Sequence, residues 1–128
     1  MISWTRPPKL FRKIYSSSLW KCCLKQNVLL SFDDGPGPHT DELLNLSQEY
    51  NIKFAFFILP EQAQKHPEIV HRIVKEDHIL GSHFFQHRRH IMDTKTTFLN
   101  SLNESVEKIE NISQNTIQYS RVPYGRLL

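Results

Sequence analysis

The chain has 128 residues, of which 39% are hydrophobic and 23% are charged, so it can bury one modest core and we expect one domain rather than two. Its formal net charge of +3 and its pI near 9.0 are mild, so we expect no nucleic-acid partner, although its basic beginning could touch nucleic acid or acidic lipid. No stretch approaches the ~20 consecutive apolar residues of a membrane-spanning helix, so we expect no transmembrane segment.

Residues 1–26 show no clean hydrophobic period, and we expect them to form a basic, solvated N-terminal arm with one short helix around residues 9–15. Cys22 and Cys23 are the only cysteines, and because adjacent cysteines rarely bridge we expect both to pack as small apolar side chains. Polar residues interrupt the apolar part of the arm, so the arm shows no evident signal-peptide core. We therefore expect a cytoplasmic location.

The first predicted strand is Val28–Phe32, a short β-prone run that precedes the turn-forming pair Gly35-Pro36. Thr40 is placed to cap the first predicted helix, because two acidic residues follow it directly. Apolar residues then recur at helical spacing, so that this helix is expected to end at about Tyr50.

The second strand is predicted over Phe54–Leu59, which is almost wholly apolar, as in a strand buried on both faces. Residues 61–65 can form a short helical turn, and Pro67 suits the first position of a second helix. One face of that helix is apolar and consists of Ile69, Val70, Ile73 and Val74.

A third strand is predicted at Ile79-Leu80, leading into the segment 81–83. Apolar residues at helical spacing, Leu99, Leu102, Val106, Ile109 and Ile112, indicate a third helix. Residues 117–122 are predicted to form a fourth strand that ends at Pro123-Tyr124-Gly125. The alternation of strands and helices favours an α/β fold with a parallel sheet, either open or curled into a barrel.

Polar residues follow three of the predicted strands, namely Asp33, His83 and Arg121. Because the carboxyl ends of parallel strands are where such folds assemble sites, we expect these residues to converge. The glycines give modest support, since all four lie in segments at strand ends: Gly35, Gly37, Gly81 and Gly125.

His83 and His87 could chelate one divalent ion if the segment between them turns helically, with a carboxylate from Asp33 or Asp34 as the third ligand. Two imidazoles and one carboxylate suit catalytic zinc, and also cobalt, iron or nickel. A merely histidine-rich surface is the alternative, because other histidines lie nearby in the sequence.

The second aspartate could act as a general base if it does not bind the metal. Arg121 could orient this base, and the backbone N–H after Pro123 could stabilise an oxyanion, although a surface salt bridge would also explain Arg121. An aspartate-nucleophile phosphotransferase is disfavoured, because its two aspartates are separated by one residue whereas Asp33 and Asp34 are adjacent and face opposite sides of a strand.

Three motifs resemble those of the polysaccharide deacetylases, the NodB-homology or carbohydrate esterase family 4 domain. Residues 31–36, Ser-Phe-Asp-Asp-Gly-Pro, resemble its first motif, Thr/Ser-Phe-Asp-Asp-Gly-Pro. Residues 81–87 resemble its second, His-Ser/Thr-x-x-His, and residues 121–125 its third, Arg-x-Pro-Tyr. Residues 53–59 also resemble the family's Lys-Ala-Thr-Phe-Phe strand, so that the likeness covers residues 28–128.

The resemblance implies the N-terminal part of a deformed (β/α) barrel and a divalent metal, expected to be zinc, held by Asp34, His83 and His87. It also implies that Asp33 is the general base, that Arg121 orients it, and that the backbone N–H of Tyr124 stabilises the oxyanion. The implied reaction is hydrolysis of the acetamide of an N-acetylated glycan, with release of acetate. The residues alone do not decide which aspartate would bind the metal.

The family pattern continues with further strands, an acidic and aromatic motif, and a last Leu-x-Leu-His motif whose histidine protonates the leaving amine. Nothing up to Leu128 matches these parts, so we expect residues 27–128 to be a partial deacetylase domain without this acid and with an unpaired sheet edge that lowers its solubility. Smaller departures, such as Ser82 in place of a usual Asn, are expected to alter the cleft rather than remove the metal. A catalytically inactive domain that binds metal or sugar is the main alternative, and a metal amidohydrolase acting on other amides is a third.

Overall fold

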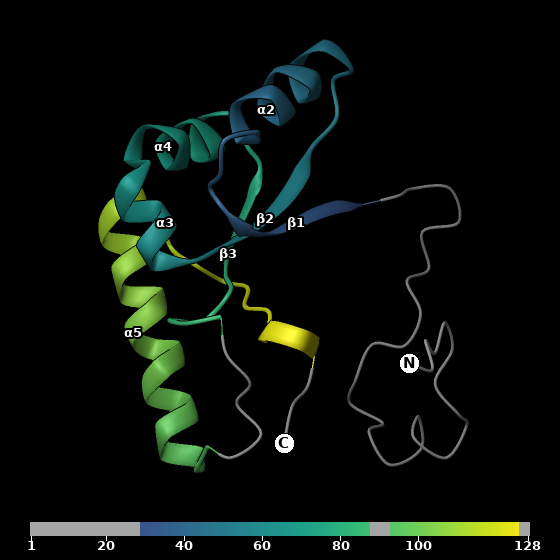
Figure 1. Ribbon diagram of the computed structural model, residues 1–128. Coiled ribbons are helices and arrows are strands. Elements are labelled where there is room, and N and C mark those ends of the chain that lie inside the picture. Colours follow the sequence, from purple (N-terminus) through teal and green to yellow (C-terminus); the bar gives the residue numbers. More distant parts are fainter. Residues whose placement is uncertain (1–28, 88–92, 126–128) are drawn as a thin grey trace, which may run out of the picture.

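The computed structural model describes residues 29–87 and 93–125. The expected N-terminal arm, its short helix and both cysteines lie outside these residues. The described part contains a three-stranded parallel sheet in the order β1 (Leu30–Gly35), β2 (Phe54–Ile58), β3 (Ile79–Ser82) (Figure 1). The predicted α/β architecture with parallel strands is therefore present.

Strand β1 continues further than the sequence predicts, because Asp33 and Gly35 pair with β2 as well. The register shifts between Asp33 and Gly35, which leaves Asp34 as the extra residue of a bulge with a backbone φ of 67°. A bulge of this kind bends the strand and re-aims the side chain that it carries. The carboxylate pair thus belongs to the strand itself and not to the turn behind it.

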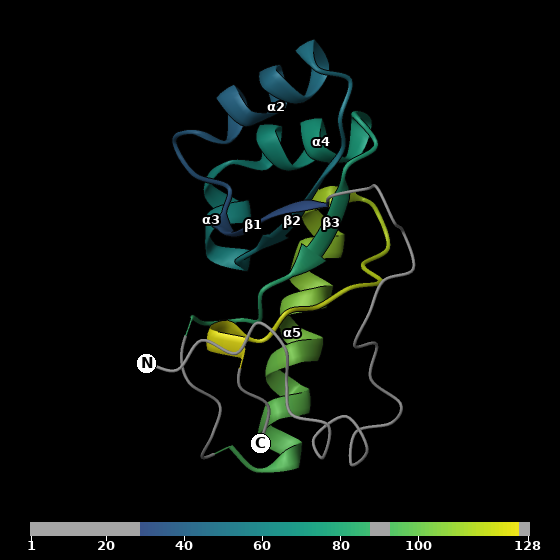
Figure 2. The same cartoon turned by 90° about the vertical axis from the view of Figure 1, so that its right-hand side faces the viewer.

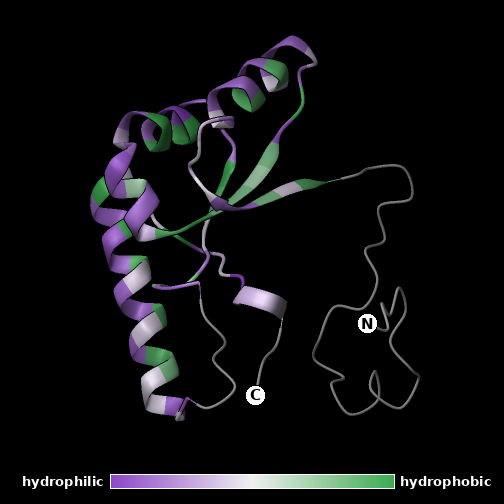
Figure 3. Cartoon of the chain, viewed as in Figure 1, coloured by the Kyte–Doolittle hydropathy of each residue, from purple (hydrophilic) through white to green (hydrophobic). Residues whose placement is uncertain are grey.

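Strand β2 is the centre of the core, since all five of its residues are buried. Phe32 of β1 packs on Phe54 and Phe56 of β2, with ring centroids 5.2 and 5.5 Å away. Figure 3 shows hydrophobic residues on the strands and on the helix faces that meet them. The remaining buried members of this core come mainly from the helices and β3: Leu44, Ile58, Ala63, Ile69, Val70, Ile73, Leu80, Ile109 and Ile117.

Within the described residues, four α-helices accompany the sheet: α2 (Thr40–Glu49), α3 (Pro60–Lys65), α4 (Pro67–Lys75) and α5 (Lys95–Ser113). In Figures 1 and 2, α2 and α4 lie above the sheet, while α3 and α5 run along one side of it. Helix α5 packs against α3, α4 and β3. Among the described residues, no helix combines the length and the apolar character needed to cross a membrane.

Two helix beginnings differ from the prediction. His39, not Thr40, precedes α2 as its capping residue, and the Thr40 hydroxyl instead accepts a hydrogen bond from the backbone N–H of Gly37. Helix α5 begins at Lys95, before the first apolar residue of its period, because Thr94 caps it by accepting the N–H of Thr97. A polar capping side chain therefore decides where α5 begins, whereas the His39 side chain makes no capping hydrogen bond to α2.

The predicted fourth strand is wrong as an element. Residues 117–122 run extended beside β3 but form only one isolated bridge, Ser82 to Ser120. Two backbone hydrogen bonds hold the segment there, from Ser82 N–H to Tyr119 O (2.9 Å) and from Arg121 N–H to Ser82 O (2.8 Å). The chain then enters a short 3₁₀ turn, η1 (Pro123–Gly125), which lies below the sheet in Figures 1 and 2.

Candidate metal centre

The two adjacent aspartates of β1 contact different partners. Asp33 keeps the regular strand register and contacts Arg121, whereas the bulge at Asp34 directs its carboxylate toward the histidines that follow β3.

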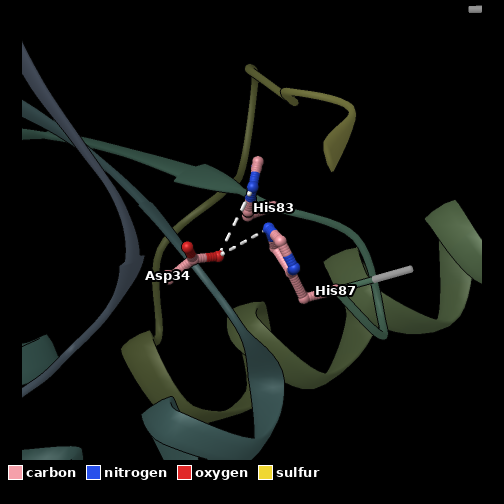
Figure 4. Close-up of side chains that lie close together, drawn as sticks. All are labelled: Asp34, His83 and His87. Atoms are coloured by element: carbon pink, nitrogen blue, oxygen red, sulfur yellow. Dashed lines mark ion pairs between the residues drawn. The ribbon is translucent and has the colours of Figure 1, made fainter. Parts of the chain in front are cut away.

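Asp34, His83 and His87 come together as a possible set of metal ligands (Figure 4). Asp34 Oδ1 lies 3.5 Å from His83 Nε2 and 3.4 Å from His87 Nε2, and one ligand atom from each residue lies within 4.8 Å of the others. With metal–ligand bonds of roughly 2.1 Å, ligands of a tetrahedral ion are about 3.4 Å apart. The two oxygen–nitrogen distances match this spacing, so the three residues fit a divalent ion.

His83 and His87 converge without a helix, since residues 83–87 contain no helical turn. His83 is 2% exposed, and its backbone N–H donates to Ile58 O at the end of β2 (2.9 Å). Its neighbour Phe84 has a φ of 66°, in the left-handed region that few side chains other than glycine, Asn and Asp adopt. This turn in the backbone brings His87 back toward Asp34. Among the described residues, the buried Nδ1 of His83 has no hydrogen-bond partner, and the imidazole contacts Asp34 through Nε2.

Arg121 reaches the other aspartate from the C-terminal segment. Its Nη1 donates to Asp33 Oδ1 (2.7 Å) and to Ser31 Oγ (2.9 Å). The guanidinium carbon lies 4.0 Å from the centroid of the Phe57 ring, an arrangement that favours a cation over an aromatic face. Phe57 and Ser31 thus fix the guanidinium from two sides, and Arg121 in turn fixes the Asp33 carboxylate.

Tyr124 lies beside the histidines within η1. Its ring centroid is 4.7 Å from that of His87, and its backbone φ of 61° is in the left-handed region. The structure therefore brings Tyr124 to the metal-ligand side of the site, while Asp33 and Arg121 lie on the adjoining side. All the site residues named from the sequence are found in this one region.

Several neighbours of the site were not named from the sequence as functional residues. Ser31 and Phe57 contact Arg121, as described above. Phe84 stands at the place where the second motif of the deacetylase pattern has Ser or Thr, and it is buried against Phe98, with centroids 4.9 Å apart. Only the folded structure shows that Ser31 and Phe57 contact Arg121, because in the sequence both look like ordinary strand residues.

Comparison with known proteins gives one family. The family described as "Polysaccharide deacetylase" matches residues 21–128. A peptidoglycan-N-acetylglucosamine deacetylase of Bacillus cereus is 33% identical over 105 residues, which are 81% of this chain and 38% of that protein. A chitooligosaccharide deacetylase of Rhizobium leguminosarum is 36% identical over 63 residues, which are 48% of this chain and 29% of that protein.

Solved structures give the same picture. The peptidoglycan deacetylase PdaC from Bacillus subtilis matches with a TM-score of 0.75 and 32% identity, over 81% of this chain and 52% of that one. The polysaccharide deacetylase Bc1974 from Bacillus cereus matches with a TM-score of 0.70 and 32% identity, over 77% and 48%. Such neighbours have a deformed (β/α) barrel, so the predicted fold class is confirmed. The chain spans less than two fifths of the length of the curated relatives described above.

Proposed function

The chain belongs to the polysaccharide deacetylase family, and we propose that it acts in the removal of N-acetyl groups from amino-sugar polymers or oligomers of the peptidoglycan or chitin type. The observation that carries this proposal is the convergence of a two-histidine, one-carboxylate set with a separate aspartate–arginine pair. We propose that these groups hydrolyse the carbon–nitrogen bond of an acetamide and not a peptide bond.

We propose that Asp34, His83 and His87 hold a divalent ion, zinc in the first place, with cobalt, iron and nickel as alternatives. Such an ion, when bound, would supply a Lewis acid that activates water and polarises the acetamide carbonyl. The chain would provide three ligand atoms, two imidazole nitrogens and one carboxylate oxygen.

Asp33 is the proposed general base. Arg121 donates to Asp33 Oδ1 and to Ser31 Oγ. Because Oδ1 already accepts this hydrogen bond, we assign the proton taken from the attacking water to Oδ2. The oxygen of the attacking water forms a bond to the carbonyl carbon while this carboxylate accepts the proton. The arginine keeps the carboxylate oriented during approach of the substrate.

The backbone N–H of Tyr124 is the proposed donor to the oxyanion that forms from the carbonyl oxygen. Collapse of this intermediate breaks the carbon–nitrogen bond and releases acetate and an amine, which must take up a proton. The six residues of the proposed site have other assignments, so the amine takes this proton from solvent water, and Asp33 returns its own proton to solvent.

The test measures acetate release from N-acetylated chitooligosaccharides and from peptidoglycan fragments by the polypeptide of residues 1–128. It compares the parent with Asp33→Asn, in the presence of zinc and after treatment with a chelator. We expect release that the chelator abolishes and that Asp33→Asn lowers by about 10²–10⁴-fold. Asp77→Asn is the matched control, because Asp77 precedes β3 at the end remote from His83 and is expected to leave release unchanged.

Two other results would contradict the proposal. Zinc binding without acetate release from either glycan would favour a non-catalytic domain that binds metal or sugar. Release from non-sugar amides alone would favour a different metal amidohydrolase.

A further inference from the structure

We infer that Ser82, assisted by Ser105 of α5, is a positioning residue that holds the two histidines of the candidate metal centre in register with Asp34. The inference rests on the proposed function, because the centre that Ser82 positions is the proposed metal site. Ser82 itself contributes no ligand to that site.

The Ser82 side chain has two hydrogen-bond partners. Its Oγ accepts the backbone N–H of Phe84 (3.1 Å) and lies 2.7 Å from the hydroxyl of Ser105. Both serines are 0% exposed. In such a place water does not replace a lost partner, so each hydroxyl matters more than it would at the surface.

The bond to Phe84 acts at the point where the chain turns from His83 toward His87. Phe84 has a φ of 66°, which is unfavourable for a residue with a β-carbon. Such a conformation persists only where surrounding contacts hold it. Phe84 has two such contacts, the hydrogen bond from its N–H to Ser82 Oγ and the packing of its ring on Phe98. If the bond is lost, the turn can relax and carry His87 away from Asp34.

The backbone of Ser82 has a separate task. It pairs with Tyr119 and Arg121 of the C-terminal segment, and His83 next to it pairs with Ile58. Removing only the Ser82 hydroxyl leaves these backbone bonds in place. The change should therefore loosen the histidine turn while leaving Arg121 beside Asp33.

A buried serine can also be merely structural, and the chain offers a matched control for that role. Ser113 lies on the same helix as Ser105, is 4% exposed, and bonds to the backbone of Asn115. Its hydroxyl supports a turn after α5 through hydrogen bonds with Asn115, which is not a site residue. Replacing it tests the general cost of losing a buried hydroxyl from α5.

The experiment measures zinc affinity by competition with a chromophoric chelator, and the visible absorption of the cobalt-loaded protein, for the chain of residues 1–128. The variants are Ser82→Ala, Ser105→Ala and Ser113→Ala, and the thermal unfolding of each is recorded. We expect Ser82→Ala to lower zinc affinity about 10-fold, within the 10–100-fold typical of residues that orient metal ligands, and to alter the cobalt spectrum. Ser105→Ala should have a smaller effect in the same direction, and Ser113→Ala should change only the unfolding temperature.

The inference is overturned if Ser82→Ala binds zinc as the parent does and shows the same cobalt spectrum. If Ser82→Ala does not fold, Ser105→Ala decides, because it lies outside the motif and leaves the Phe84 bond itself in place. A parent that binds zinc but releases no acetate contradicts the proposed function alone. A parent that binds neither metal overturns both.

Discussion

At the scale of single residues, the adjacent aspartates of β1 divide the site into two halves. The bulge at Asp34 turns its carboxylate toward the histidines, while Asp33 keeps the ordinary register and meets Arg121. The sequence predicted that carboxylates and histidines would meet, because both follow strands of a parallel sheet. It could not tell from the residues which aspartate faces the histidines, because that depends on the bulge.

Arg121→Lys tests how the guanidinium holds Asp33. Lysine keeps the positive charge but has a single point donor and no planar group to lie over Phe57, so it cannot replace both contacts. We expect acetate release to fall roughly 10-fold, less than the loss expected for removing the base itself. Zinc affinity should stay within about twofold of the parent, since the guanidinium of Arg121 donates to Ser31 and Asp33, which are not proposed metal ligands.

The companion variant for this prediction is Ser31→Ala, which removes only the second contact of the same nitrogen. It should lower acetate release less than Arg121→Lys does. Unchanged release in Arg121→Lys would mean that charge alone, and not the fixed geometry, is what Asp33 requires.

At the scale of elements, His78 ties the beginning of β2 to α2. Its Nδ1 accepts the backbone N–H of Phe54 (3.1 Å), and its Nε2 lies 3.1 Å from Ser47 Oγ, whose own proton goes to Leu44 O. This pattern requires the neutral imidazole with its proton on Nε2. Burial, followed by the charge of Lys53, lowers the pKa of His78 below 6.5, and the opposing effect of Glu76 is smaller.

The free energy of unfolding should therefore fall as the pH drops below about 6.5. The unfolded chain binds the His78 proton at a higher pH than the folded chain does, so protonation favours unfolding, whereas above this pH both states are neutral. Urea unfolding between pH 8 and 5 measures the slope. His78→Leu should be less stable at pH 8 by about 1–3 kcal/mol, because Phe54 N–H loses its acceptor, and should show a flatter pH dependence.

A change at His39, whose side chain is exposed, serves as the reference for this slope. His39→Gln should keep the pH dependence of the parent. An equally steep slope in His78→Leu would assign the effect to other groups.

At Gly81, β3 lies close to Phe57 of β2 and to Tyr119 of the C-terminal segment. A β-carbon there would lie 2.7 Å from two atoms of the Phe57 ring and 3.0 Å from Tyr119 O. We expect Gly81→Ala to destabilise the chain by about 1–3 kcal/mol, as overpacked sites do, and to lower acetate release because the Phe57 ring supports Arg121. Urea unfolding and the acetate assay measure the two effects.

Gly37→Ala is the matched variant, since a β-carbon at Gly37 meets nothing within 4 Å. It should change stability by less than about 0.5 kcal/mol. Equal effects at the two glycines would contradict close packing as the cause.

Periodicity identified the helices and the buried strands, because an apolar face must recur every turn or run unbroken through a sheet. It failed at residues 117–122, where apolar and aromatic residues favoured a strand. Among the described residues, the segment forms backbone hydrogen bonds to β3 only at Ser82, so the regular ladder does not form. Pairing depends on a partner strand in space, and a single sequence window does not contain that information.

At the scale of the whole molecule, the sheet edge formed by β1 carries exposed apolar residues. Leu29 and Leu30 are 60% and 49% exposed, and Ile52 before the neighbouring strand is 40% exposed. Exposed apolar residues at a strand edge favour association with another chain. The expectation of low solubility for residues 1–128 stays a prediction on this ground.

The roles proposed for the site residues also predict whether residues 1–128 cleave an ester or an amide faster. An amine leaving group must be protonated as the carbon–nitrogen bond breaks, whereas 4-nitrophenolate leaves without a proton. Since Asp33, Asp34, His83, His87, Arg121 and Tyr124 all have other proposed tasks, we expect 4-nitrophenyl acetate to be cleaved at least about 100-fold faster than chitooligosaccharides are deacetylated. Both reactions should be lost on chelation and reduced in Asp33→Asn, which separates catalysis at this site from unspecific ester cleavage by surface groups. Equal rates for the amide and the ester would mean that a group within residues 1–128 already protonates the leaving amine, and the pH dependence of the amide reaction would then give the pKa of that group.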